Sequence, residues 1–384
     1  QSGSSKQKYQ GNTLVREGVL TIDHNTSLPA TTNVEIDSSA SLRILNSSQE
    51  IKSLVIADEG QVNSGDLGLE LLSNRGQMRA GSLEGNSAPN RFENYGSIRV
   101  NGNIQTGEGD DLIVNYGDLY APQGIEMGPG DDLFRFSGRE LNINSTYLVD
   151  GGQGKDTVLL NSAEMPVVVN PGSDASQQSA SDRQVIVASE LTDRFVGFET
   201  LVQEKGAYEY KGDFSRSFDQ TILRDGVFVA RESSPAVFNT LELQKDATIV
   251  VGMINTTGDE VDQAPIVVTS QDSLGGFLYS GGSFVISADR QDDPDGDFFV
   301  IEGNVVNPES LAAKTSIVYD CDLNSSSCIQ QDFTGLGRDN GIDTALREVY
   351  LREGSLQLVV EVKSKQDEFC DLYPNDPQCN SESP

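Results

Sequence analysis

The sequence contains no tryptophan and a single histidine, His24, and no run of eighteen apolar residues occurs in it. Without such a run, no segment is long and apolar enough to cross a bilayer as a helix. A Ser-His-Asp triad would have to use His24, which lies in a polar turn, and the Gly-x-Ser-x-Gly turn of many hydrolases is also missing. No nucleotide-binding glycine loop precedes a helix. These absences argue against triad hydrolases, nucleotide-binding enzymes and helical membrane proteins.

Basic residues are also scarce. The 384 residues include 27 lysines and arginines against 59 aspartates and glutamates, which gives a formal net charge of −32. A field of this sign repels nucleic acid and anionic lipid, so we expect neither as a partner. It attracts divalent cations and keeps an edge-rich β protein from self-association. Apolar residues make up 36%, and the frequent Ser, Asn, Asp, Gly, Thr and Val favour strands and turns over helices.

The four cysteines form two close pairs in polar segments, Cys321 with Cys328 and Cys370 with Cys379. Neither pair has the C-x₂-C spacing of a zinc site, and no histidine lies nearby. We therefore expect two local disulfides rather than free thiols, and an oxidising compartment.

What the sequence does contain is a repeat. Gly76, Gly96, Gly117 and Gly138 are separated by 20, 21 and 21 residues, and each period holds two or three short alternating strands with turns between them. A fixed period in this range is typical of a solenoid, in which each repeat buries its apolar face by stacking on its neighbours. We predict an all-β fold, a right-handed parallel β-helix of about 20–24 residues per rung, from about residue 14 to 362.

A second motif, Gly-x-Gly-x-Asp, recurs in the same rhythm and ends at Asp111, Asp132 and Asp156. It resembles the calcium-binding nonapeptide of repeats-in-toxin proteins, although the spacing here is 21 and then 24 residues. Glycine lets the carbonyl oxygens of a tight turn point inward and aspartate adds a carboxylate, and calcium prefers such ligands. The resemblance implies a structural calcium column held by these aspartates together with Asp110 and Asp131. The alternative is that the loops are plain turns that satisfy their own backbone.

A weaker calcium candidate lies further along the chain. Asp293, Asp295 and Asp297 alternate around a glycine turn, but the closing glutamate of a twelve-residue calcium loop is missing. An exposed acidic hairpin tip would explain the same residues.

Two other sets of residues follow the repeat. Asn74, Asn94 and Asn115 are expected to form a hydrogen-bonded ladder in the turns. Tyr95 and Tyr116 lie between these asparagines and the glycines, and they are expected to point outward as a stripe that suits carbohydrate or protein binding. An internal aromatic stack is expected from two further residues, Phe134 and Phe136.

The cadence of strand, small-residue corner and strand resembles that of the passenger domains of bacterial autotransporters (type V secretion). The stretches that carry the resemblance are Val34–Ile44, Phe195–Leu201, Phe238–Val251, Gly281–Ser287, Asp297–Gly303 and Gly354–Glu361. The resemblance covers about residues 14–363 and implies a β-helix that is extracellular or displayed on a bacterial cell surface at the outer membrane. It also implies a C-terminal membrane barrel, which is absent from this chain and would be its only link to a membrane.

The sequence suggests four regions. These are a disordered N-terminal segment at 1–13, a regular β-helix with the Gly-Asp repeats at 14–164, a less regular β-helix with inserted loops at 165–363, and a polar tail with a cysteine pair at 364–384. The soft boundary near residue 165 rests on a stretch within 165–190 that is rich in Ser, Asp and Gln.

These features favour a secreted or surface-displayed, non-enzymatic adhesin that binds a protein or glycan ligand or other copies of itself. One alternative is a structural subunit that self-assembles into extracellular fibres, because the open ends of a solenoid can stack. A second is a β-helix enzyme that degrades polysaccharide with a pair of carboxylates. The arginines and lysines that would hold an acidic substrate look scattered in the sequence.

Overall fold

The fold is described from a computed structural model. It covers residues 11–23, 27–137, 141–142, 149–161, 184–187, 191, 193–231, 234–252, 264–270, 272, 275–288, 296–306, 310–311, 315–319, 346–351 and 357–362. The chain divides into two compact units. The first contains Gln1–Gln178 and Leu191–Val202, and the second contains Ser179–Glu190 and Gln203–Pro384. In both, short strands pair in parallel with strands one turn further along the chain, so the predicted parallel β-solenoid is confirmed.

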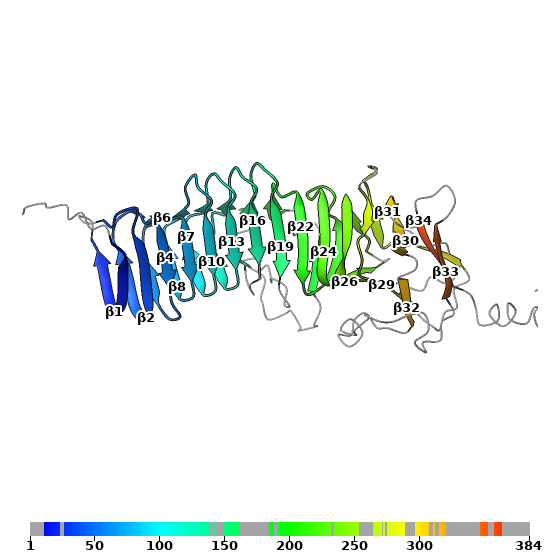
Figure 1. Ribbon diagram of the computed structural model, residues 1–384, viewed down its shortest axis with the longest axis horizontal. Coiled ribbons are helices and arrows are strands. Elements are labelled where there is room, and N and C mark those ends of the chain that lie inside the picture. Colours follow the sequence, from blue (N-terminus) through cyan, green and yellow to red (C-terminus); the bar gives the residue numbers. More distant parts are fainter. Residues whose placement is uncertain are drawn as a thin grey trace, which may run out of the picture. The chain divides into compact units, whose positions relative to one another are not determined.

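The first unit is built from three stacked columns of parallel strands (Figure 1). The first sheet contains β1 (Thr13–Ile22), β2 (Asn33–Ile44), β4 (Ser53–Ile56), β7 (Leu71–Asn74), β10 (Arg91–Asn94), β13 (Leu112–Asn115), β16 (Leu133–Phe136) and β19 (Thr157–Asn161). The second sheet contains the later halves of β1 and β2, then β5 (Gln61–Asn63), β8 (Gln77–Ala80), β11 (Ser97–Val100), β14 (Asp118–Tyr120) and β17 (Leu141–Asn142). The third sheet contains β3 (Ser48–Glu50), β6 (Asp66–Gly68), β9 (Leu83–Glu84), β12 (Ile104–Gln105), β15 (Ile125–Glu126), β18 (Val149–Asp150) and β21 (Phe195–Val196).

The register gives the length of each turn. Leu71 pairs with Arg91, Arg91 with Leu112, and Leu112 with Leu133. Side chains alternate along each strand, so that one residue faces the interior and the next faces solvent. In β10, for example, Phe92 and Asn94 are buried whereas Arg91 is exposed. The core is therefore a set of stacked rows, each filled by one residue per turn.

The predicted glycine column lies at the corner between the first and second sheets. A Cβ on Gly96 would lie 2.2 Å from the carbonyl oxygen of Gly76, and one on Gly117 would lie 1.9 Å from that of Gly96. Gly60, which the repeat did not reveal, begins the column, because its oxygen lies 2.2 Å from the Cβ position of Gly76. Stacking of Gly76, Gly96 and Gly117 is thus confirmed, and Gly138 lies outside the described residues.

The second unit continues with parallel strands of less even spacing, and β22 (Thr200–Lys205) joins the two units along the chain. Its strands are β20 (Gln184–Val187), β23 (Ala207–Asp213), β24 (Gln220–Arg231), β25 (Ala236–Phe238), β26 (Thr240–Gly252), β27 (Ile266–Val268), β28 (Phe277–Tyr279), β29 (Ser283–Ala288), β30 (Gly296–Glu302), β31 (Val305–Val306), β32 (Thr315–Tyr319), β33 (Leu346–Leu351) and β34 (Gln357–Val362). The β24–β26 pair keeps a turn of 20 residues at Gln220 and Thr240, whereas Thr248 pairs with Ser283. Insertions between strands explain the longer turns.

The last strand differs from the expectation of a final parallel rung near Gly354–Glu361. β34 pairs antiparallel with both β30 and β33. An alternating apolar pattern predicts a strand but carries no information on its direction, which explains the difference.

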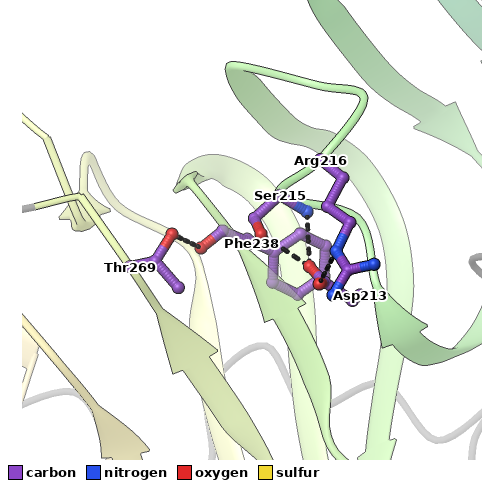
Figure 2. A network of polar contacts seen from close by, with 5 residues as sticks. All are labelled: Asp213, Ser215, Arg216, Phe238 and Thr269. Carbon is purple, nitrogen blue, oxygen red and sulfur yellow. Dashed lines mark hydrogen bonds and ion pairs between the residues drawn. The ribbon is translucent and has the colours of Figure 1, made fainter.

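A polar network holds one tight turn of the second unit, between β23 and β24 (Figure 2). The Asp213 carboxylate accepts hydrogen bonds from the backbone N–H of Ser215 at 3.1 Å and from its hydroxyl at 2.5 Å, and it pairs with Arg216 at 2.9 Å. Beside it, the Thr269 hydroxyl donates to the carbonyl of Phe238 at 3.2 Å. The Asp213 contacts satisfy the turn locally, and the Thr269 bond joins two neighbouring segments, so we interpret the network as structural.

Candidate functional site

The aspartates of the Gly-x-Gly-x-Asp loops form a ladder. Each lies directly before a strand of the first sheet, namely β13, β16 or β19. Oδ1 of Asp111 accepts the backbone N–H of Asn90 at 2.6 Å, that of Asp132 accepts the N–H of Asp111 at 2.7 Å, and that of Asp156 accepts the N–H of Asp132 at 2.8 Å. The ladder ends where Glu199 accepts the N–H of Asp156 at 2.7 Å. The predicted column of three aspartates is therefore confirmed, and each carboxylate joins its turn to the preceding one.

The second oxygen of each aspartate has no such partner. Oδ2 of Asp111, Asp132 and Asp156 is buried and makes no hydrogen bond within the described part of the chain. The pKa of Asp132 is raised to about 7, mainly by burial and also by the neighbouring Asp111 and Asp156 carboxylates, against the lowering effect of the Asp111 N–H bond. Burial likewise raises the pKa of Asp156 to about 6, with Glu199 adding to the rise. The charged forms of Asp132 and Asp156 are thus disfavoured.

Asn90, at the head of the ladder, shows which chemistry this position favours. Its amide nitrogen donates to the carbonyl oxygens of Asn86, Ala88 and Thr106 at 3.2, 2.5 and 2.9 Å. It also donates to Oδ1 of Asp111 at 3.1 Å. Asparagine and aspartate have the same shape, but an ionised aspartate has no hydrogen to donate. A proton on Oδ2, or a cation beside it, would supply what the aspartates lack.

The loops that precede the ladder aspartates contain stacked glycines. Their φ angles are positive, a backbone conformation that other residues rarely adopt. Gly107, Gly128 and Gly152 have φ values of 103, 97 and 102°, and each stacks on the loop of the previous turn. The loops therefore present their backbone in register from one turn to the next. This is the arrangement that the Gly-x-Gly part of the motif predicts.

Asp110 and Asp131 lie outside the ladder. Both are exposed, and they form a second line in which Asp110 accepts the N–H of Asp131 and Asp131 accepts the N–H of Lys155, each at 2.9 Å. Among the described residues, no three or more His, Cys, Asp or Glu side chains lie together as a metal site would require. A cation at the ladder would therefore depend mainly on backbone oxygens and on one carboxylate at a time.

The asparagine ladder is confirmed. The amide of Asn74 donates to Oδ1 of Asn94, the amide of Asn94 donates to Oδ1 of Asn115, and the amide of Asn115 donates to the carbonyl of Gly117, each at 2.8 Å. All three side chains are buried. Their amide groups donate inside the corner beside the glycine column, and Oδ1 of Asn74 is buried without a partner in the described part of the chain. Because all three side chains are buried, they are unavailable to an external ligand.

The tyrosines point outward as predicted, but they form a closed stack. The rings of Tyr95 and Tyr116 lie 4.9 Å apart and nearly parallel, and Arg75 lies over Tyr95 at 5.1 Å from its centroid. Both faces of Tyr95 and one face of Tyr116 are thus covered. A sugar ring that stacks on an aromatic side chain needs an open face, so this stripe is a poor carbohydrate platform. The predicted internal stack is confirmed, because Phe134 and Phe136 are buried with ring centroids 6.5 Å apart.

The structure also gathers residues that looked scattered in the sequence. On the outward face of the second sheet, Arg43 pairs in register with Asn63, Asn63 with Arg79, Arg79 with Arg99, and Arg99 with Tyr120. The four residues from Arg43 to Arg99 are exposed. We call Arg43, Arg79 and Arg99 the arginine row. The signal was present in the repeat, since Arg79 and Arg99 each follow a column glycine by three residues.

Other predicted residues cannot be placed. Asp293 and Asp295, His24 and all four cysteines lie outside the described residues, so the second calcium candidate and the disulfides stay predictions. Asp297 belongs to β30, but its side chain is not described. Within the described chain, no helix has the length and apolar character needed to cross a membrane. Comparison with protein families, curated proteins and solved structures found no match to this chain.

Proposed function

We propose that this chain is a non-enzymatic interaction protein that is secreted or displayed on a bacterial cell surface, as the resemblance to autotransporter passengers suggests. The observation that supports binding is the outward face of the second sheet. Its other register row runs through Ser41, Gln61, Gln77 and Ser97, beside the arginine row. Polar side chains on a continuous parallel sheet offer one hydrogen-bonding position per turn to an extended partner. We call this face, formed by both rows, the polar flank.

The buried carboxylates support a non-enzymatic role. A polysaccharide-degrading enzyme needs an acid and a base that face a common substrate. In the aspartate ladder, each Oδ1 instead accepts a backbone N–H of the neighbouring turn. These carboxylates connect turns, and this arrangement favours a scaffold over an active site.

Binding of the purified chain to immobilised glycans, matrix proteins and itself tests the proposal. We expect at least one class to bind, and truncation of the flank by Gln61→Ala with Gln77→Ala to weaken that binding several-fold. Val55→Ala with Leu71→Ala is the matched control, because both side chains are 43% exposed on the first sheet. Binding that the flank variant leaves intact contradicts the proposal. Release of reducing ends from polysaccharide, or filaments in negative-stain microscopy, would favour the enzyme or the fibre instead.

We further propose calcium as a structural cofactor of the first unit. The orphaned Oδ2 atoms and the stacked glycine loops fit a hard cation, which prefers carboxylate and carbonyl oxygens. Asp111, Asp132 and Asp156 would each offer one carboxylate to a calcium ion, and backbone oxygens of the loops would supply the other ligands. When bound, it would offset the repulsion between neighbouring carboxylates and join successive turns.

Thermal melting at pH 8 with calcium and with chelator tests the cofactor. A ligand that binds only the folded state stabilises it by about 2.7 kcal/mol at a hundredfold excess over its dissociation constant. We expect wild type to melt several degrees higher in calcium, and Asp132→Asn to lose most of that increment because it removes one anionic ligand. Identical melting of wild type in both solutions would contradict calcium binding.

A further inference from the structure

The arginine row is unusual for a chain with a net charge of −32. Within the described residues, no carboxylate pairs with Arg43, Arg79 or Arg99, although other arginines of the chain, such as Arg91 and Arg216, do form ion pairs. On the outward faces of β5, β8 and β11, the residues beside the row are Gln61, Gln77 and Ser97, none of which is acidic. The first acid in this neighbouring row is Asp118 on β14, which pairs in register with Ser97. Up to that acidic end, the row is a strip of arginines with no ion pair among the described residues to balance its positive charge.

The geometry of the row suits a linear ligand. Because residues in register on a parallel sheet lie about 4.8 Å apart from strand to strand, Arg79 and Arg99 are neighbours and Arg43 lies about 10 Å from Arg79. The row crosses the strands, so a bound chain would run along the stack of turns. Asn63, between Arg43 and Arg79, adds an amide that can bond to a hydroxyl.

One arginine is held in place before any ligand arrives. The guanidinium of Arg99 lies over the ring of Tyr120, 4.4 Å from its centroid. Stacking on the ring leaves the guanidinium edge free to donate two parallel hydrogen bonds to a planar anion. A side chain that is already ordered loses less conformational entropy on binding.

We propose that the polar flank binds an acidic polysaccharide, whose carboxylates or sulfates pair with Arg43, Arg79 and Arg99 and whose hydroxyls bond to Gln61, Asn63 and Gln77. This inference rests on the proposed function and names the ligand class for the same face. An acidic polysaccharide is favoured over nucleic acid because its negative charges are spaced further apart. Duplex DNA carries one charge per about 1.7 Å, and a chain with this excess of acid repels it strongly. A polysaccharide with charges separated by sugar rings can place them on the row while meeting less repulsion elsewhere.

The test measures binding of the whole chain to immobilised polygalacturonate and chondroitin sulfate, with dextran as the neutral comparison. We expect both acidic polymers to bind and dextran to bind at least tenfold more weakly. The triple variant Arg43→Gln, Arg79→Gln, Arg99→Gln should lose tenfold or more in affinity. Higher salt should weaken wild type, because the contacts are ionic and exposed.

The matched control removes the same number of charges elsewhere on the first unit, by Arg16→Gln, Lys52→Gln and Arg91→Gln, all exposed positions. It should change affinity less than twofold. Equal losses in both triple variants would overturn the proposal, since they would indicate net charge rather than a site. So would failure of both acidic polymers to bind, or binding of duplex DNA or anionic vesicles with equal affinity. If the flank binds only a protein or a neutral glycan, the interaction function stands and the ligand class proposed here is wrong.

Discussion

Gly96→Ala should lower the free energy of unfolding of the first unit by roughly 3 kcal/mol or more, which is at the upper end for overpacking. The new methyl group would lie 2.2 Å from the carbonyl oxygen of Gly76 and 2.5 Å from that of Arg75. Both atoms are backbone, so no side-chain rotation can make room.

The neighbouring turns cannot separate to relieve this contact. Ser97 donates its N–H to the carbonyl of Gly76 at 2.9 Å, and Tyr95 donates to the carbonyl of Asn74 at 2.7 Å. Moving the turn outward would lengthen these bonds and those of the asparagine ladder, where Asn94 is bonded on both sides. The strain therefore extends to the turns above and below.

Gly68→Ala is the matched control. The one tight contact of its Cβ would be with the Cγ atom of Glu50 at 3.2 Å, and that side chain can move; the nearest backbone atoms lie at ordinary contact distances of 3.8 and 3.9 Å. Because a solenoid need not unfold in a single step, the comparison is made between urea midpoints followed by circular dichroism. A midpoint for Gly96→Ala within error of the control would show that the glycine column is not a steric requirement.

The parts of this fold that could be predicted are those in which one residue type repeats for one physical reason. Only glycine fits at Gly76, Gly96 and Gly117, so their spacing revealed the turn length. The asparagine and aspartate ladders followed, because each member bonds to its equivalent one turn away.

The features that the sequence did not reveal were missed for physical reasons too. Gly60 stacks in the same column, but Glu59 and Asp58 precede it instead of an Asn-x pair, so the motif was not recognisable. The two ends of the aspartate ladder are not aspartates. Asn90 donates its backbone N–H to Asp111, and the Glu199 carboxylate accepts the N–H of Asp156. The arginine row uses one exposed residue per turn, interrupted by Asn63, and exposed positions tolerate many residue types. The arginine row can be recognised only once the register of the strands is known.

The second large effect concerns pH and the aspartate ladder. In chelator, the first unit should lose stability as the pH rises from about 4 to about 7. The pKa of Asp132 is about 7 in the folded chain against an ordinary value of 3.8, so between these values the folded state holds a proton that the unfolded state has released. Stability then falls with pH, by up to about 1.4 kcal/mol per pH unit for each such proton. Asp156, whose pKa is about 6, adds to the fall over the lower part of this range.

Asp132→Asn should remove most of this slope and raise the melting temperature at pH 8. An asparagine keeps the oxygen that accepts the Asp111 N–H, and it replaces the unpartnered Oδ2 with a donor such as Asn90 already uses at the head of the ladder. The control is Asp131→Asn, which removes the same charge one residue away at an exposed position and keeps the bond from Lys155. Melting in chelator at pH 5, 6, 7 and 8 separates the two variants. If wild type is as stable at pH 8 as at pH 5, or if Asp131→Asn flattens the profile as much as Asp132→Asn does, the burial of the ladder does not control stability. If the predicted contrast holds, the protonation state of one buried carboxyl group controls the stability of the first unit.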